Sequence, residues 1–121
     1  LTEAQVALGR VSGEPEEARR RFLIAQADAP NSSLPLEALG MLELENREDE
    51  AALDAYERAR ARDPRNPGVL RQLTRTYASL HRFDDALRAA SVLTEVLPDA
   101  SELYFRARRD NAASPRGRNS S

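Results

Sequence analysis

The chain has 121 residues and a formal net charge of -2, with 20 acidic residues against 18 basic ones. This length corresponds to one ordinary domain. Because the chain contains no cysteine, disulfide scaffolds, thiolate zinc sites and cysteine nucleophiles are excluded. No apolar run approaches the roughly 20 residues that a membrane-spanning helix needs, so no membrane span is predicted.

Charge is unevenly distributed along the chain. Residues 1–64 carry eight Arg and 14 acidic residues, whereas residues 65–121 carry ten Arg and six acidic residues. The near-neutral total therefore hides an acidic half and a basic half. All basic residues are arginine, which is typical of GC-rich bacterial coding sequences. The arginine run at positions 19–21 is expected to lie on a solvated helix face.

Proline marks an internal repeat. Pro30, Pro64 and Pro98 follow one another at intervals of 34 residues. The positions 12, 8 and 5 residues before each proline are apolar in every copy: Ala18, Ala52 and Ala86, then Phe22, Tyr56 and Ala90, then Ala25, Ala59 and Leu93. A register that holds at four positions over three copies indicates a true repeat.

Each repeat is predicted to form two antiparallel helices. The apolar positions before each proline share one helical face, and proline ends the helix because it lacks an N–H group. An earlier helix carries an apolar series in the second and third copies: Leu36, Leu39, Gly40, Leu70, Leu73 and Tyr77. Asn66 and Pro67 are suited to open the third copy's first helix. Short polar turns at residues 46–48 and 81–82 would join the helices.

The segment after Pro98 predicts one further helix without a partner helix behind it. Residues 101–111 have an apolar stripe, while Arg106, Arg108, Arg109 and Asp110 are suited to a polar outer face that covers the end of the array. Residues 112–121 have no apolar periodicity, so they are expected to form a flexible tail.

These residues and spacings resemble the tetratricopeptide repeat (TPR) family, whose unit is a helix–turn–helix of 34 residues. The second copy matches through Leu39, Gly40, Tyr56 and Pro64, and the third has Thr74 where the family most often has glycine. The resemblance implies an all-α, right-handed superhelical solenoid of antiparallel helix pairs. It implies a domain over residues 1–111, made of repeats at about 1–32, 33–66 and 67–100 and a capping helix at about 101–111.

The resemblance also implies a non-catalytic scaffold that binds a partner protein in a concave groove. The family's groove positions fall on these partner-binding candidates: Met41, Arg71, Gln72, Arg75, Phe105, Arg106 and Arg109. Guanidinium groups recognise carboxylates through two parallel hydrogen bonds. An acidic segment or a C-terminal carboxylate is therefore the favoured ligand. The competing interpretation is that these arginines are only a solvated surface.

Other function classes find little support in the residues. His81 is the only histidine, it falls in a predicted turn, and no base is spaced to work with it. The acidic clusters at residues 14–17 and 48–50 begin helices, where the helix dipole favours negative charge, so neither a metal nor a cofactor is expected. A pI near 5.5 and the lack of basic stretches interleaved with aromatic residues argue against nucleic-acid binding.

Self-association is the alternative to partner capture, with the acidic half of one copy meeting the basic half of another. The chain begins at Leu1 and its first repeat is incomplete, so we expect a segment of a longer array. It is similar to the TPR arrays of bacterial envelope proteins that organise exopolysaccharide synthesis and export. The compartment stays open between the bacterial envelope or periplasm and the cytoplasm.

Overall fold

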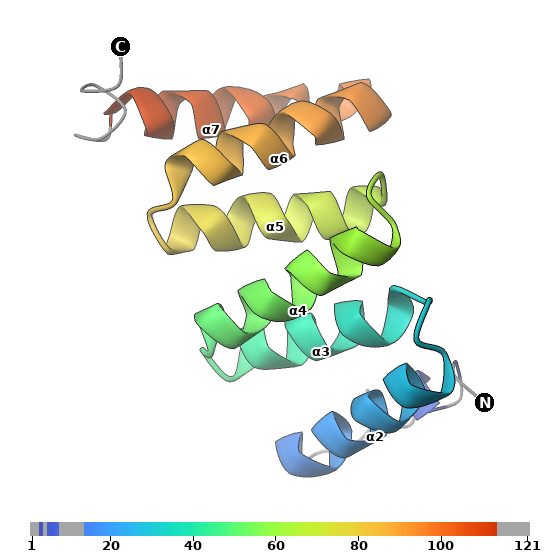
Figure 1. Cartoon of the computed structure of the whole chain (residues 1–121). Helices are drawn as coiled ribbons and strands as arrows, with labels where there is room; N and C mark the ends of the chain where they lie inside the picture. The colour runs from blue at the N-terminus through green and yellow to red at the C-terminus, as the bar shows by residue number, and fades with distance from the viewer. Residues whose placement is uncertain (1–2, 4, 8–13, 114–121) are drawn as a thin grey trace. The chain divides into compact units, whose positions relative to one another are not determined.

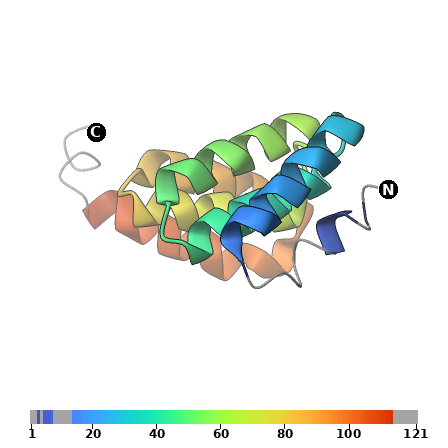
Figure 2. The ribbon, with the colours of Figure 1, turned by 90° about the horizontal axis from the view of Figure 1, so that it is seen from below.

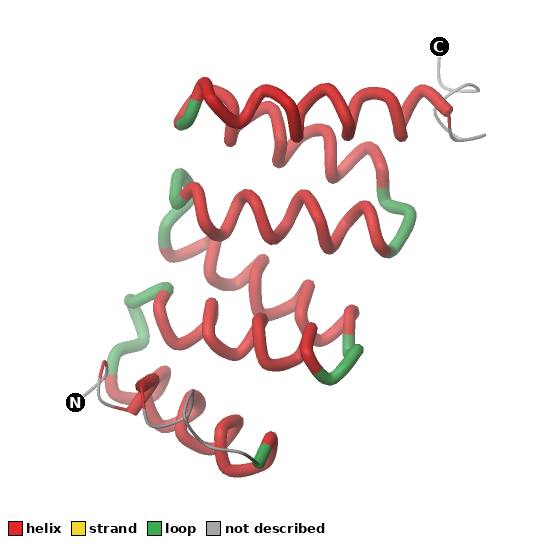
Figure 3. The backbone as a smooth tube through the Cα atoms, turned by 180° about the vertical axis from the view of Figure 1, so that it is seen from behind, coloured by secondary structure: helices red, strands yellow, loops and turns green. Residues whose placement is uncertain are grey.

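The computed structural model describes residues 3, 5–7 and 14–113, and over these residues it contains helices and loops without any strand (Figure 3). The predicted all-α class is therefore confirmed. The chain divides into two compact units, residues 1–64 and residues 65–121.

The first unit contains α2 (Pro15–Asp28), α3 (Leu34–Glu45) and α4 (Asp49–Arg62). α3 and α4 form an antiparallel hairpin through the turn at residues 46–48, and α2 packs against α3 (Figure 1). Figure 2 shows α2 lying in front of α3 when the molecule is seen from below. Residues 3 and 5–7 are also helical.

The second unit contains α5 (Pro67–Ser79), α6 (Phe83–Val96), the short 3₁₀ turn η1 (Pro98–Ala100) and α7 (Ser101–Ala113). α6 packs against both α5 and α7 (Figure 1). α7 is longer than the sequence predicts, because Ala112 and Ala113 continue the helix instead of starting the tail. Alanine has the highest helix propensity of all residues, which accounts for the extension. The rest of the predicted tail, residues 114–121, lies outside the described residues.

The repeat register is visible in the helix boundaries. α2, α4 and α6 each have 14 residues, and each ends two residues before Pro30, Pro64 or Pro98. Proline disfavours helical geometry in the residue before it, so the helix must stop ahead of it. The second helix of each repeat therefore has the same length and the same end point, as the prolines predict.

Small side chains bring the paired helices together. Ala52 and Ala59 on α4 and Ala86 on α6 are 0% exposed, and Ala18 on α2 is 3% exposed. A buried alanine adds little bulk, so neighbouring helix axes can approach closely. The predicted inward face of each second helix is thus confirmed.

The predicted start of α5 is also confirmed. The side-chain Oδ1 of Asn66 accepts hydrogen bonds from the backbone N–H groups of Gly68 (2.9 Å) and Val69 (3.3 Å). These bonds satisfy two donors that the first helical turn would leave unpaired. Pro67 occupies the first helical position, where its missing N–H is not needed.

The arginine run at positions 19–21 does more than cover a solvated face, so that prediction is wrong for Arg19. Its Nη2 lies 2.7 Å from Oε1 of Glu43 on α3, and its Nη1 lies 2.9 Å from Oε1 of Glu16. The hydrogen bond to Glu43 raises the pKa of Arg19 above its ordinary value. Arg20, by contrast, is 68% exposed and pairs with Glu17 on its own helix. Arg19 therefore links α2 to α3.

Candidate functional site

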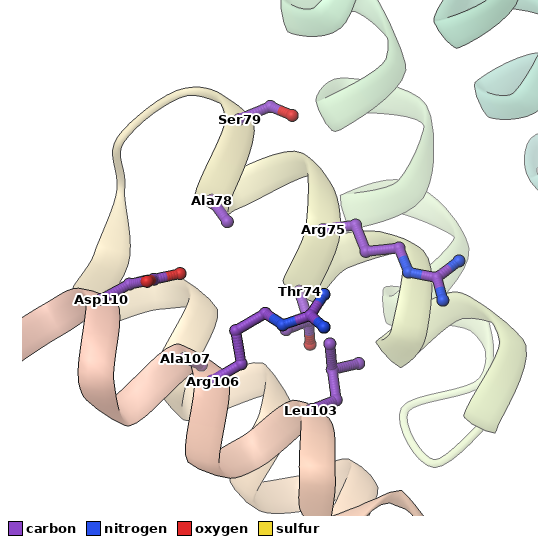
Figure 4. Close-up of a pocket in the computed structure, with 8 residues that line it drawn as sticks. All are labelled: Thr74, Arg75, Ala78, Ser79, Leu103, Arg106, Ala107 and Asp110. Carbon is purple, nitrogen blue, oxygen red and sulfur yellow. The ribbon is translucent and has the colours of Figure 1, made fainter.

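A cavity of about 330 Å³ opens between α5 and α7 in the second unit (Figure 4). Among the described residues, α5 and α7 each contribute four side chains to its lining: Thr74, Arg75, Ala78 and Ser79 from α5, and Leu103, Arg106, Ala107 and Asp110 from α7. The cavity thus joins the first helix of the third repeat to the predicted capping helix.

Small residues make the space. Ala78 and Ala107 face the cavity from the two helices, and a larger side chain at either position would fill part of it. Thr74 is buried and its hydroxyl donates to the backbone oxygen of Leu70 at 2.8 Å, so this hydroxyl is already engaged within α5. Together with Leu103, these residues give the cavity a mainly apolar wall.

Charged groups stand at the edges of this wall. Arg75 and Arg106 are exposed, and Asp110 is half-buried. Figure 4 shows the Arg106 side chain extending from α7 toward α5, and the Asp110 carboxylate projecting into the space between the two helices. No ion pair engages these three side chains within the described part of the chain. The cavity therefore offers two guanidinium groups and one carboxylate to a ligand.

The structure brings together two of the residues that the sequence assigns to the groove, Arg75 and Arg106. Arg71 and Gln72 lie one turn or less before Arg75 on α5 and are half-buried, outside the cavity lining. The other candidates are exposed and also outside the lining: Phe105 and Arg109 on α7, and Met41 on α3 of the first unit.

The prediction of a polar outer face on the last helix is wrong for Asp110. Asp110 lines the cavity beside Arg106. Residues four apart on a helix lie on the same face. The spacing from Arg106 to Asp110 was therefore a signal that could have placed both side chains together.

Among the described residues, the other titratable groups form no second candidate site. His81 lies in the turn between α5 and α6, with its ring edge against Phe83 at a centroid distance of 5.6 Å. Over the residues that the structure describes, no group of three His, Asp or Glu side chains is arranged to hold a metal ion. In the same part of the chain, no helix combines the length and the apolar character that crossing a membrane requires.

Comparisons with known proteins agree on the fold. A family model described as tetratricopeptide repeat matches residues 44–110, which is more than half of the chain. No curated protein sequence matches. The structure of MamA is similar with a TM-score of 0.79 and 21% identity, covering 98% of this chain and 72% of MamA.

Two further solved structures share this fold. The type III secretion chaperone SycD of Yersinia enterocolitica, solved with a peptide of the translocator YopD, has a TM-score of 0.73 and 18% identity over 89% of this chain and 87% of SycD. A thermophilic TPR protein of Thermus thermophilus has a TM-score of 0.66 and 24% identity over 91% of this chain and 60% of its own. The chain belongs to the tetratricopeptide repeat family, whose helix pairs are in general non-catalytic scaffolds for protein–protein interaction.

Proposed function

We propose that this chain binds an acidic segment or the C-terminal carboxylate of another protein in the cavity between α5 and α7. The observation that carries the proposal is that two guanidinium groups without an ion pair among the described residues, Arg75 and Arg106, line one cavity. Each guanidinium presents parallel donors that match the two oxygens of a carboxylate. Two such groups beside an apolar wall favour a carboxylate over a neutral ligand.

The apolar wall has a role of its own in this proposal. Leu103, Ala78 and Ala107 offer contact to the carbon atoms of the partner's side chains next to the carboxylate. Burying that apolar surface adds affinity, while the arginines orient the ligand. The SycD structure, which holds a peptide of another protein, supports peptide binding as a use of this fold.

Side chains outside the cavity would extend the binding surface. Arg71, Gln72 and Arg109 lie on the same two helices as the cavity, and Phe105 is 57% exposed there. Met41 on α3 of the first unit is 46% exposed, and its flexible thioether would give that unit an adaptable apolar contact of its own. These residues complete the proposed partner-binding set.

A charge-reversal variant tests the proposal. The double change Arg75→Glu and Arg106→Glu is expected to abolish binding to immobilised peptides that carry acidic residues or a free C-terminal carboxylate, with little change in melting temperature. The control is Arg58→Glu with Arg108→Glu, which changes the net charge equally at two exposed positions outside the cavity. Peptide binding that survives the cavity change, or is lost equally in the control, contradicts the proposal.

Self-association is the second candidate function, and the charge distribution favours it. The acidic residues 1–64 of one copy would meet the basic residues 65–121 of another, as a link in a longer TPR array of a bacterial envelope assembly for exopolysaccharide synthesis or export. Light scattering of the isolated chain tests this: oligomers that dissociate as the salt concentration rises support it, and a monomer at low salt contradicts it. Fractionation of the host cell would decide between the envelope and the cytoplasm.

A further inference from the structure

We propose that Asp110 makes the cavity selective for an extended segment that carries one acidic and one basic side chain, separated by a single residue. This inference rests on the proposed function, because Arg75 and Arg106 must first hold the acidic side chain. Asp110 then favours a ligand with a basic side chain two positions away from the acidic one.

The placement of Asp110 is the first argument. Its half-buried carboxylate lines the same cavity as Arg75 and Arg106, and no ion pair neutralises it within residues 14–113. A purely acidic ligand would bring a second negative charge toward Asp110, and like charges at such short range repel. A basic group on the ligand would instead meet an unpaired carboxylate. The cavity is therefore complementary to a mixed pair of charges.

The spacing of the two charges on α7 is the second argument. Asp110 follows Arg106 by four residues, so their Cα atoms lie about 6 Å apart along the helix axis. In an extended peptide, residues i and i+2 project to the same side and lie about 6.6 Å apart. An acidic side chain at one of these positions and a basic side chain at the other can thus reach Arg106 and Asp110 together.

The size of the cavity is the third argument. The cavity has a volume of about 330 Å³, which is at the small end of the range for ligand sites. Two neighbouring side chains of a short extended segment, one acidic and one basic, suit a cavity of this size.

Titration calorimetry with designed peptides tests this selectivity on the full chain in 0.15 M salt. Threonine-rich host peptides would carry Glu-x-Lys, Lys-x-Glu or Glu-x-Glu at the centre, since either direction along α7 is possible. The tighter of the two mixed peptides is expected to bind about three- to fivefold more tightly than the Glu-x-Glu peptide, as a partly exposed charge pair predicts. In Asp110→Asn the ratio of these two affinities is expected to fall below twofold.

The matched control is Asp99→Asn. Asp99 is exposed in η1 and lies outside the cavity lining, and its replacement changes the net charge by the same amount. A ratio that stays unchanged in Asp110→Asn, or that falls equally in Asp99→Asn, overturns the role of Asp110. The proposed function still stands if Arg75→Glu with Arg106→Glu abolishes the binding of every peptide. Failure of all the peptides to bind the unmodified chain overturns both.

Discussion

The ring of Tyr56 occupies the space that a side chain at Gly40 would need. A Cβ atom at Gly40 would lie 2.7 Å from Cζ of Tyr56 and 2.8 Å from its Cε1 and Cε2. Carbon atoms in favourable contact lie about 3.5–4.0 Å apart, so no side chain fits without displacing the ring. Glycine on α3 is therefore what allows Tyr56 on α4 to be 1% exposed.

The corresponding positions of the third repeat carry the larger side chain on the first helix. The residues 34 positions further on are Thr74 and Ala90, which are 2% and 0% exposed. A residue larger than glycine is therefore accommodated on the first helix when the second helix carries a small one.

Substitutions at Gly40 and Tyr56 test whether the sizes of these two residues depend on each other. Gly40→Ala is expected to destabilise the protein by about 1–3 kcal/mol through overpacking, and Tyr56→Ala by about 3–5 kcal/mol through the cavity it leaves. Gly40→Thr combined with Tyr56→Ala, which imports the third repeat's pair, is expected to cost less than the sum of Gly40→Thr and Tyr56→Ala made singly. Chemical denaturation followed by circular dichroism measures all four variants.

Gly68→Ala is the matched control for the glycine change. Gly68 is exposed near the start of α5, so an added methyl group meets no buried ring. Helix propensity then favours alanine by up to about 1 kcal/mol. A loss of stability in Gly68→Ala as large as that in Gly40→Ala would show that the Tyr56 contact is not the cause.

Backbone strain in two equivalent turns predicts that a glycine substitution stabilises the protein. Arg47 and His81 stand 34 residues apart and have φ angles of 61° and 59°, a left-handed conformation that costs a side chain about 1–2 kcal/mol. The sequence has glycine at the corresponding position of the first repeat, residue 13. Arg47→Gly is expected to raise the free energy of unfolding by about 0.5–1 kcal/mol, which denaturant titration can measure.

The turn residues themselves supply the controls. Arg47→Ala shortens the side chain but keeps the Cβ atom, so it is expected to bring no gain. His81→Gly is expected to gain less than Arg47→Gly, because it also loses the ring contact to Phe83. Equal stabilisation by alanine and glycine at position 47 would mean that the arginine side chain, not its φ angle, is the source of the cost.

The helices could be predicted because their signals are local and repeated. The alanines before Pro64 define the buried face of α4, and Pro64 defines its end. The same spacing recurs in α2 and α6, so the pattern does not depend on one copy that could arise by chance. The first helix of the third repeat was predicted in the same way from Leu70, Leu73 and Asn66. A shift of the repeat spacing by one residue would place polar residues at these buried positions, so the spacing fixes the buried face.

The cavity could be predicted only in part. Arg75 and Arg106 fall at groove positions that the family resemblance implies, so their helices and faces followed from the register. The position of Asp110 depends on how α7 is rotated against α5, and only its spacing from Arg106 points to the cavity. The link from Arg19 to Glu43 joins residues 24 positions apart, which no local pattern encodes.

That link between α2 and α3 gives a coupling prediction. The side chains of Arg19 and Glu43 are 30% and 12% exposed, so solvent screens the pair only partly. A double-mutant cycle with Arg19→Ala and Glu43→Ala is expected to give a coupling energy of about 0.5–1 kcal/mol that shrinks in 1 M salt. The pair Arg58 and Asp54, with side chains 45% and 72% exposed, is the control, with a coupling energy near the lower end of the range for surface pairs. Equal coupling in both cycles would contradict a special contribution from Arg19.

Burial of Tyr56 leads to a prediction about alkaline pH. Burial, followed by the nearby charges of Glu37 and Glu45, raises the pKa of Tyr56 from 10.0 to about 12. The folded state therefore favours the neutral phenol, so this contribution to stability is complete below pH 10 and is lost as the pH rises toward 12. The shift corresponds to about 2–3 kcal/mol. Denaturant unfolding at pH 9 and pH 11.5 is expected to show the loss in the unmodified chain and in Tyr104→Phe, but a smaller loss in Tyr56→Phe. An equal loss in Tyr56→Phe would assign the alkaline transition to other groups, because phenylalanine cannot ionise.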